Sequence, residues 1–350
     1  MKPLTYRAAG VDIDAGDDAV RRIATLARST ARPEVLAGVG GFAAFVSMPA
    51  RYREPVMVAS TDGVGTKLKV AFLADRHDTV GIDLVAMGVN DLLVHGAEPL
   101  YFLDYIGTAR LDPGRVETIV KGVVAGCRLA GCALVGGETA ELPDLYAPGE
   151  YDLAGFAVGV AERLGLVDGS RVRPGDVVLG LPSSGLHSNG YTLARRIVFD
   201  VMKLTVDAML PGTGRTVADE LLTPTRIYAK PVRALLERVE VRAMAHVTGG
   251  GLPGNLPRVL ERRRPLPVGH DDHHAGGKAG TRARVENGLE VRTAARGEDA
   301  EAERRRPGRH ATTSTPRSPA TTSPSRRTLS PVSRRTSVAR SASLGGRTIT

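Results

Sequence analysis

The stretch Pro55-Val-Met-Val-Ala-Ser-Thr-Asp-Gly-Val-Gly-Thr-Lys67 joins a short apolar run to a polar loop that contains two glycines. Its first six residues predict a buried strand. In the following residues, glycine lets the backbone approach a phosphate closely, while Asp62 and Lys67 supply charge. Functional sites are often built in loops at strand ends, so this stretch predicts a site as well as a fold.

The same pattern recurs on both sides of this stretch. Helices are expected over 17–29 and 79–95 and after Asp112-Pro113, which supplies an N-cap and a proline for the first turn. Strands are expected over 100–106, 132–135, 152–160, 177–181 and 241–247, and further helices over 191–203 and 225–239. Glycine-containing loops are expected at 38–41, 61–67, 136–141 and 182–190, and again at 248–251. The turn region at 168–174 is the best domain boundary, which predicts two α/β-type domains.

Composition separates the chain into a body and a tail. Residues 261–350 hold 19 Lys and Arg against 9 Asp and Glu, whereas the first 260 residues hold 28 against 29. All 14 Phe and Tyr residues also lie before residue 261. A segment with so few large apolar side chains cannot offset its chain entropy, so the tail is expected to be disordered. The net charge of +9 therefore describes the tail and is no sign that the body binds nucleic acid.

Several classes of protein are excluded by what the sequence lacks. No apolar run is long enough for a membrane span, and the first residues have no secretory signal pattern. The two cysteines, Cys127 and Cys132, exclude a disulfide framework, and the default expectation is a cytosolic protein. Neither a Walker A motif nor a dinucleotide-binding GxGxxG motif is found after a strand.

Each candidate site residue also has an ordinary structural explanation. Asp62 fits an Asx-turn, Asn90 and Asp91 fit a helix end, and Glu138 fits a solvated loop. His187 is equally compatible with a hydrogen-bonded loop histidine, and Lys67 with a surface lysine. Their joint occurrence at strand and helix ends favours the functional interpretation, because carboxylates, a lysine and glycine N–H groups suit nucleotide chemistry with Mg²⁺.

Longer motifs carry a family resemblance. These motifs are Gly10-Val-Asp-Ile-Asp-Ala-Gly16, Ser60-Thr-Asp-Gly-Val-Gly-Thr-Lys-Leu68, Gly81-Ile-Asp-Leu-Val-Ala-Met87, Val89-Asn-Asp-Leu92, Gly96-Ala-Glu-Pro99, Phe102-Leu-Asp-Tyr105, Gly136-Gly-Glu-Thr-Ala-Glu141, Leu186-His-Ser-Asn-Gly-Tyr191, Pro224-Thr-Arg-Ile-Tyr228 and His246-Val-Thr-Gly-Gly-Gly251. On these residues the sequence resembles phosphoribosylformylglycinamidine cyclo-ligases, also called aminoimidazole ribonucleotide synthetases, almost without a gap from about Tyr6 to Leu260.

The resemblance implies an α+β, two-domain aminoimidazole ribonucleotide synthetase-like fold. Residues 1–165 would form an ATP-binding domain that pairs with a second copy into a shared β-barrel, so a homodimer is implied. Residues 166–260 would form a second α/β domain that is incomplete. The implied reaction is the ATP-dependent ring closure of formylglycinamidine ribonucleotide, an early intermediate of purine biosynthesis. ATP and Mg²⁺ are implied, and neither a membrane nor a specific nucleic acid is.

The resemblance also assigns roles to individual residues. Asp62 and Asp91 would hold Mg²⁺ and the triphosphate, with Lys67 neutralising phosphate charge. Activation of the substrate is assigned to His187, and substrate binding to His187, Ser188 and Asn189. Lys67 and Asp91 join His187 as the expected catalytic residues. The expected nucleotide pocket comprises Gly40, Gly41, Asp62, Gly63, Gly65, Thr66, Lys67, Asn90, Asp91, Gly137 and Glu138.

The resemblance stops after Leu260, where Glu261-Arg-Arg-Arg264 begins the basic tail. Either an out-of-frame reading of the gene or a natural disordered tail would give this composition, and the former is the expectation. Two other functions stay open at this point. One is another ATP-dependent enzyme of the same superfamily, and the other is a non-catalytic protein that binds polyanions through the tail.

Overall fold

The computed structural model describes residues 5–6, 9–260, 284–285 and 289–292. The expected disorder and altered reading frame of residues 261–350 therefore lie almost wholly outside the described residues. Contacts group residues 1–296 into one unit and residues 297–350 into a second, and everything described here belongs to the first. No helix in the described ranges is long and apolar enough to cross a membrane.

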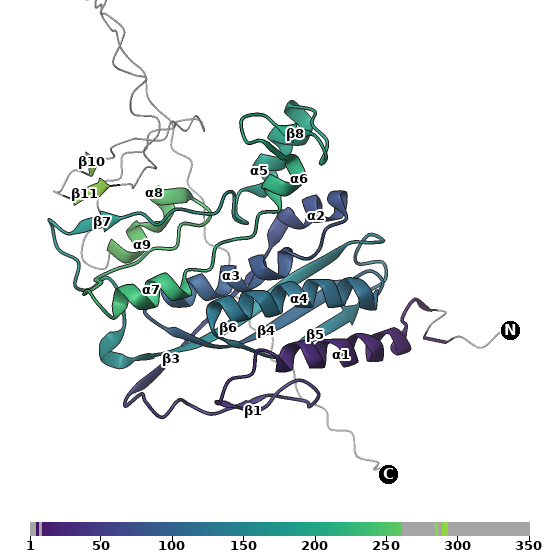
Figure 1. Cartoon of the computed structure of the whole chain (residues 1–350), viewed down its shortest axis with the longest axis horizontal. Helices are drawn as coiled ribbons and strands as arrows, with labels where there is room; N and C mark the ends of the chain where they lie inside the picture. The colour runs from purple at the N-terminus through teal and green to yellow at the C-terminus, as the bar shows by residue number, and fades with distance from the viewer. Residues whose placement is uncertain (1–4, 7–8, 261–283, 286–288, 293–350) are drawn as a thin grey trace, which may run out of the picture. The chain divides into compact units, whose positions relative to one another are not determined.

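A four-stranded sheet with strand order β3-β6-β4-β5 forms the centre of this unit (Figure 1). β4 and β5 run parallel, and β6 pairs antiparallel with both β3 and β4. The strands are β3 (Pro55–Gly63), β4 (Glu98–Thr108), β5 (Ala133–Glu141) and β6 (Tyr151–Glu162). The sheet is open within one chain, which leaves the shared barrel expected from the sequence as a prediction.

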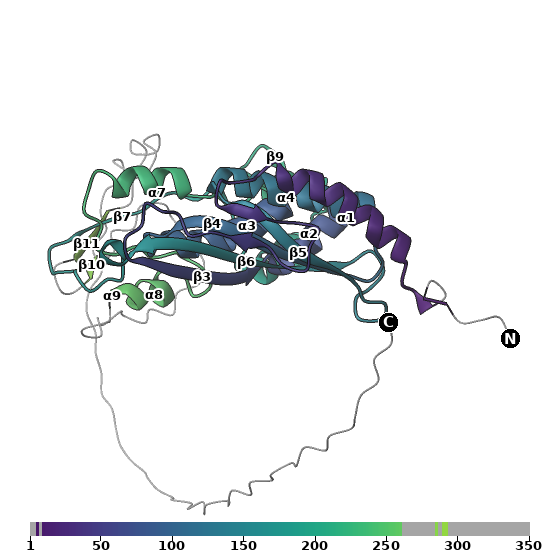
Figure 2. The same ribbon diagram turned by 90° about the horizontal axis from the view of Figure 1, so that it is seen from below.

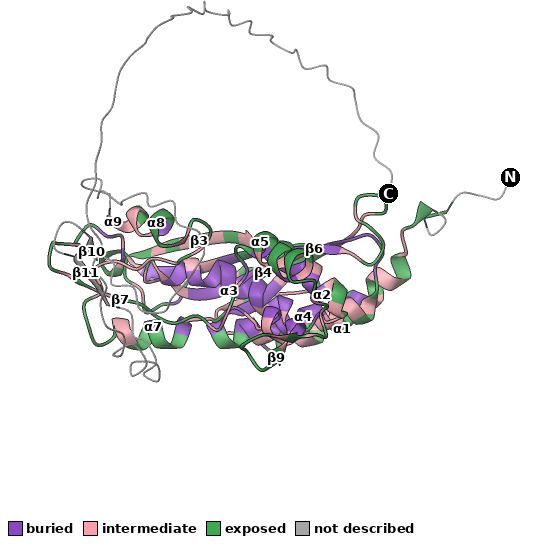
Figure 3. Cartoon of the chain, turned by 90° about the horizontal axis from the view of Figure 1, so that it is seen from above, coloured by how far each residue is buried: buried purple, intermediate pink, exposed green. Residues whose placement is uncertain are grey.

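Three helices cover one face of the sheet, as Figure 2 shows. They are α1 (Ile13–Arg28), α3 (Val80–Leu93) and α4 (Pro113–Ala130). Figure 3 shows that the buried residues concentrate in α3 and α4, against the sheet. α3 and α4 touch through glycine, because a Cβ on Gly81 would overlap the backbone of Ile119 and Val123. The core therefore depends on two helices that pack backbone to backbone.

The remaining elements are short. Before the sheet come β1 (Val35–Ala37) and β2 (Phe45–Val46), and after β3 come a 3₁₀ turn (Gly65–Lys67) and α2 (Leu68–Ala74). A 3₁₀ turn (Arg163–Gly165) leads to β7 (Val177–Leu179), α5 (Tyr191–Arg195), a π-helical turn (Arg196–Val201), β8 (Met209–Leu210), β9 (Arg215–Thr216), α6 (Val217–Leu221), α7 (Ala229–Leu236), α8 (Gly251–Asn255) and α9 (Pro257–Leu260). β10 (Arg284–Val285) pairs with β11 (Leu289–Arg292), which pairs with β7.

Two expected loops turn out to be partly regular structure. β3 continues through Asp62 to Gly63, and the next residues form the 3₁₀ turn. The whole expected loop at 136–141 belongs to β5, because β4 offers a continuous hydrogen-bonding partner as far as Thr108. Glycine and charge in these segments suggested loops, but pairing with a neighbouring strand decided the structure.

The expected elements after residue 224 are shorter than predicted or absent. The helix expected over 225–239 is reduced to α7, because the N–H groups of Thr225 and Tyr228 donate to the side chains of Asp83 and Asn90. No strand forms over 241–247, a correction to the sequence prediction, since the described residues offer this segment no neighbouring strand. Strand propensity alone does not make a strand without a partner.

Candidate active site

Three polar side chains of helix α3, Asp83, Asn90 and Asp91, form hydrogen bonds with residues between 225 and 246. Most residues of the helix are apolar and buried. Two polar side chains are buried among them: Asp83 is fully buried, and Asn90 is 2% exposed. Asp83 and Asn90 are two turns apart and therefore share one face of the helix. Together with the adjacent Asp91, they contact residues that lie more than 130 positions later in the chain. The site is therefore assembled along one helix.

Asp91 lies at the centre of this arrangement. Its Oδ1 accepts a hydrogen bond from Nδ1 of His246 at 2.8 Å, and its Oδ2 accepts one from Ser60 Oγ at 3.1 Å. Partial burial would raise the pKa of the Asp91 carboxyl, but the hydrogen bond and charge of His246, with the bond from Ser60, lower it overall. Asp91 is therefore an ionised carboxylate at the junction of β3, α3 and the segment before α8.

His246 had no role in the sequence prediction. Its side chain is 11% exposed, and its contact with Asp91 spans 155 residues of sequence. The available signal was its position at the start of His246-Val-Thr-Gly-Gly-Gly251, directly after an apolar run. Sequence spacing alone does not pair it with Asp91, because the pairing depends on the tertiary fold.

The Asn90 side chain forms hydrogen bonds with distant backbone. Its Nδ2 donates to the carbonyl of Arg226 at 2.9 Å, and its Oδ1 accepts from the N–H of Tyr228 at 3.2 Å. Both ends of the buried amide are therefore occupied by the protein backbone. The Asn90 side chain therefore fixes the entry to α7, and its expected contact with the nucleotide stays a prediction.

His187 is held as a neutral imidazole. Its Nε2 lies 3.2 Å from the N–H of Ser184, 3.1 Å from the Ser184 Oγ and 3.4 Å from the N–H of Arg226. The backbone N–H groups can only donate, so Nε2 accepts and Nδ1 carries the proton. Burial first, and then the positive charges of Lys67, His246 and Arg226, lower the pKa of His187 to about 4. The Nδ1–H group can donate to a ligand at neutral pH.

The two residues after His187 differ in exposure. Ser188 is buried, with its Oγ 3.2 Å from Oγ1 of Thr225. Asn189 is exposed, and Gly249 lies beside its Oδ1. Of the expected substrate-binding residues, Asn189 and His187 are therefore accessible, whereas the Ser188 side chain is directed into the protein.

Lys67 departs most clearly from expectation. It is fully buried, and its Nζ lies 2.9 Å from Asp83 Oδ1, 3.0 Å from the His187 carbonyl and 2.7 Å from the Thr223 carbonyl. An ammonium group has three N–H donors, and all three are used within the protein. The burial of Lys67 excludes a surface lysine, while its expected role in neutralising phosphate charge stays a prediction.

The other predicted residues of this stretch lie at the end of β3. Asp62 Oδ1 accepts a hydrogen bond from the N–H of Gly63 at 2.7 Å, while Thr66 Oγ1 contacts Thr192 Oγ1 at 3.1 Å. Gly65 has a φ of +70° and open space where a Cβ would stand. Since L side chains avoid this conformation, glycine here keeps the backbone accessible to a ligand.

Four other expected residues of the nucleotide pocket are not brought to Asp91. Gly137 packs against buried Asp104, whose carboxylate a Cβ at this position would overlap. Glu138 pairs with Tyr105 across the sheet and is exposed on the face opposite to that of Asp62. Gly40 and Gly41 are exposed in the loop between β1 and β2, and no contact to the Asp91 group is seen in the described residues.

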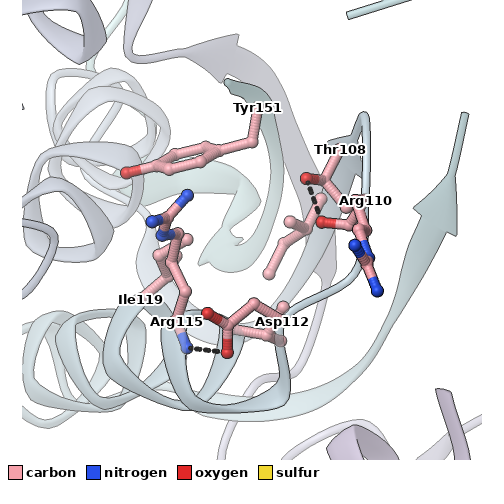
Figure 4. A pocket seen from close by; sticks show the side chains of 8 residues that line it. Thr108, Arg110, Asp112, Arg115, Ile119 and Tyr151 are labelled. Carbon is pink, nitrogen blue, oxygen red and sulfur yellow. Dashed lines mark hydrogen bonds between the residues drawn. The ribbon is translucent and has the colours of Figure 1, made fainter. Parts of the chain in front are cut away.

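A small pocket lies elsewhere, between the end of β4 and the start of α4 (Figure 4). Its lining residues are Ile106, Thr108, Arg110, Asp112, Arg115, Val116, Ile119 and Tyr151. The side chain of Thr108 donates to the carbonyl of Arg110, and that of Asp112 caps α4. None of the expected site residues lines this pocket. Over the described ranges, no three His, Cys, Asp or Glu side chains are grouped as a metal site.

Comparisons with known proteins place this geometry in context. The family model "AIR synthase related protein, N-terminal domain" matches residues 43–161, and its C-terminal counterpart matches residues 173–264. A phosphoribosylformylglycinamidine cyclo-ligase of Citrifermentans bemidjiense is 60% identical over 258 residues, which cover 73% of this chain and 74% of the relative. The enzyme of the same name from Myxococcus xanthus is 61% identical over 257 residues, covering 73% and 74%.

Another relative reaches slightly further along the chain. The cyclo-ligase of Anaeromyxobacter dehalogenans is 61% identical over 276 residues, which cover 76% of this chain and 79% of the relative. Among solved structures, thiamine-monophosphate kinase from Stenotrophomonas maltophilia K279a has a TM-score of 0.49 at 21% identity, covering 69% of this chain and 70% of that one.

Proposed function

The chain belongs to the phosphoribosylformylglycinamidine cyclo-ligase family, and we propose that the residues gathered around Asp91 and His187 carry out the reaction of that family. The reaction is the ATP-dependent ring closure of formylglycinamidine ribonucleotide to aminoimidazole ribonucleotide in purine biosynthesis. The observation that carries this conclusion is the convergence of α3 with the loop of His187 and with His246, in a chain about 60% identical to named cyclo-ligases.

The chemistry explains why such residues are needed. An amide oxygen is a poor leaving group, and its phosphorylation by ATP turns it into a good one, which an internal nitrogen then displaces as phosphate. Phosphoryl transfer depends mainly on positioning and charge neutralisation. His187 is neutral, and its Nδ1–H has no partner among the described residues, so it suits hydrogen bonding to the substrate amide or phosphate; exposed Asn189 suits substrate binding beside it.

Nucleotide binding is proposed at the end of β3. Gly65 leaves backbone open to a phosphate, and Gly63 and Thr66 lie within two residues of it in the sequence. Gly40 and Gly41 are retained as parts of a loop that closes over ATP, since Gly40 has a φ of +117° and nothing near its Cβ position. Glu138 lies on the opposite face of the sheet, and its contact with the nucleotide stays a prediction from the sequence.

Mg²⁺ is proposed to bind through Asp62 and Asp91. Two carboxylates are enough, because Mg²⁺ is usually held by one or two carboxylates together with substrate phosphates and water. The donor set fits: among the described residues each Asp91 oxygen accepts one hydrogen bond and retains a lone pair, and the carboxylate is ionised. When bound, the ion would neutralise phosphate charge.

A homodimer is proposed through the sheet face that α1, α3 and α4 leave uncovered. Cross-strand pairing puts Met57, Phe156, Val158, Tyr101 and Leu103 on that face. Met57 and Phe156 are each 45% exposed. An apolar sheet face of this kind favours burial against a second copy. The domain boundary near residue 165 is retained as part of the proposal.

The proposed nucleotide site can be tested by titrating ATP into the full chain by calorimetry, with and without Mg²⁺. We expect one ATP per chain and markedly tighter binding when Mg²⁺ is present. Asp17→Asn, at an exposed position on α1, is the matched control and should bind ATP as the wild-type chain does. Equal affinity with and without Mg²⁺, or no saturable binding at all, would contradict the proposal.

A further inference from the structure

A buried ion pair links the end of β3 to the segments around the proposed substrate site. Lys67 and Asp83 are both 0% exposed, and their charged atoms are 2.9 Å apart. Burial lowers the pKa of Lys67 and raises that of Asp83, while their mutual attraction opposes both shifts. Such pairs seldom stabilise a fold more than apolar residues of similar volume would, so the pair calls for another explanation.

The two charges are used for directional contacts with distant backbone. Lys67 Nζ donates to the carbonyls of His187 and Thr223, which are 120 and 156 residues further along the chain. Asp83 Oδ1 accepts from both the N–H and the Oγ1 of Thr225, at 2.7 and 2.6 Å. An apolar pair could fill the same volume, but it could not hold two carbonyls and an N–H group in place.

These contacts fix the backbone of His187 and the backbone segment that donates to its ring. Lys67 fixes the backbone carbonyl of His187 itself. Asp83 fixes Thr225, and the N–H of the next residue, Arg226, points at His187 Nε2 from 3.4 Å. Ser188 adds a third link through its Oγ, which lies 3.2 Å from Oγ1 of Thr225. The ion pair therefore anchors two backbone segments: the one that carries the His187 ring and the one, at Thr225 and Arg226, that donates a hydrogen bond to it.

We propose that Lys67, Asp83 and Thr225 form a buried clamp that positions the His187 ring for the substrate. The three are positioning residues, because their polar atoms face the protein and none is exposed to a ligand. The inference rests on the proposed function only in assigning His187 to the substrate side of the site.

The test uses Thr225→Val and Thr225→Ser in the full chain. Valine keeps the shape of threonine but removes the hydroxyl that donates to Asp83, whereas serine keeps the hydroxyl. Two readouts are needed: the pKa of His187 by NMR titration of its ring, identified by the signal lost in His187→Gln, and calorimetric affinities for ATP and for formylglycinamidine ribonucleotide.

In Thr225→Val we expect the His187 pKa to rise from about 4 toward the ordinary histidine value, as the ring loses its fixed partners. Affinity for formylglycinamidine ribonucleotide should fall about tenfold, the usual scale for a lost hydrogen bond to a charged group. Affinity for ATP should be unchanged. Thr225→Ser, which keeps the hydroxyl, should show the wild-type His187 pKa and the wild-type affinity for formylglycinamidine ribonucleotide.

The double variant Lys67→Met with Asp83→Leu covers the case in which Thr225→Val fails to fold. Removing both charges together avoids an unpaired buried charge, so this variant should keep its Tm. Loss of the Lys67 charge by itself raises the pKa of His187, so the readout here is affinity: that for formylglycinamidine ribonucleotide should fall about tenfold and that for ATP should be unchanged. An unchanged His187 pKa in Thr225→Val, a loss that serine does not rescue, or a double variant that loses affinity for ATP would overturn the clamp. A shifted pKa with unchanged substrate affinity would support the clamp and contradict the proposed substrate-side role of His187.

Discussion

The Asp91 carboxylate is ionised and accepts a hydrogen bond on each oxygen, from His246 and from Ser60. Each oxygen keeps a lone pair for a further ligand. Asp91→Asn keeps the shape of the side chain and removes its charge. We expect kcat to fall about 100-fold or more, because a lost metal carboxylate removes charge stabilisation in the transition state. Asp62→Asn should behave similarly. Near-normal kcat/KM in either variant would disprove the assignment to Mg²⁺ and the triphosphate.

His187 gives a second prediction at this scale. His187→Gln should lower kcat while ATP affinity stays within about twofold, because the ring lies on the substrate side of the site. If ATP affinity falls and kcat is retained, the residue belongs to the nucleotide pocket instead. Steady-state kinetics combined with ATP titration distinguishes the two results.

The low pKa of His187 adds a dependence on pH. Burial and neighbouring positive charges favour the neutral ring in the folded chain, so the unfolded chain binds its proton first as the pH falls. The contribution of His187 to stability is complete above about pH 6.5, the ordinary histidine value, and declines down to about pH 4. We expect the difference in Tm between wild type and His187→Gln to change within this window and to be constant above it. A difference that varies above pH 7 would contradict the assigned pKa.

At the level of residues, the sequence predicts which side chains are important better than it predicts what they touch. Asp91 and His187 were identified from the glycine-containing motifs around them, and the structure brings both to one region. The burial of Lys67 is not predictable from the sequence, because its partner Asp83 lies inside an apolar helix, where no local pattern marks it. Contacts between residues far apart in sequence determine these roles.

At the level of elements, α3 and α4 depend on glycines where their backbones meet. A Cβ on Gly81 would stand within van der Waals overlap of Ile119 and Val123 backbone atoms, which cannot move as a flexible side chain can. Gly81→Ala should therefore destabilise the chain by about 3 kcal/mol, near the upper end for overpacking.

Gly16→Ala in α1 is the matched control for this variant. This glycine is also helical, but nothing lies within 4 Å of its Cβ position. Alanine should stabilise the helix there by about 0.5–1 kcal/mol. Denaturant unfolding of both variants measures the difference, and equal stabilities would show that α3 and α4 do not pack as described.

A helix whose start is marked by an N-cap residue and a proline is predictable from the sequence. The short elements in the second half of the chain are not. Asp112 and Pro113 predict the start of α4, and in the structure the helix begins at Pro113 with Asp112 as its N-cap. By contrast, the apolar run at 241–247 looked like a strand, but a strand requires a neighbour, and none pairs with it in the described residues. Local pattern determines the first kind of element and tertiary pairing the second.

At the scale of the whole molecule, the uncovered sheet face predicts the oligomeric state. Phe156→Lys would place a charge in the middle of the proposed interface and should convert a dimer into a monomer. Leu164→Lys is the control, since Leu164 is 87% exposed and lies outside the sheet. Sedimentation velocity distinguishes the two. A wild-type monomer, or a Phe156→Lys dimer, would contradict the interface.

We expect slow turnover because many apolar side chains in the second half of the chain are exposed. Apolar side chains such as Val177, Leu179 and Val239 are more than half exposed there, and the named relatives extend beyond the aligned region by about a quarter of their length. Each large apolar side chain left unburied forfeits about 1.5–3 kcal/mol, against a net stability of about 5–15 kcal/mol for a typical domain. A completed chain, with residues 1–260 joined to the part of the Myxococcus xanthus relative that lies outside the alignment, should therefore turn over at least about tenfold faster than the full chain. Equal rates would mean that the chain needs no such completion.

The most direct measurement follows product and ADP together in purified full chain and completed chain, each supplied with ATP, Mg²⁺ and formylglycinamidine ribonucleotide. The account predicts aminoimidazole ribonucleotide in both, with one ADP formed per ring closed, no product when either substrate is omitted, and loss of both signals in Asp91→Asn. If neither chain forms the imidazole product, or if ADP accumulates at the same rate without formylglycinamidine ribonucleotide, the assigned function is wrong.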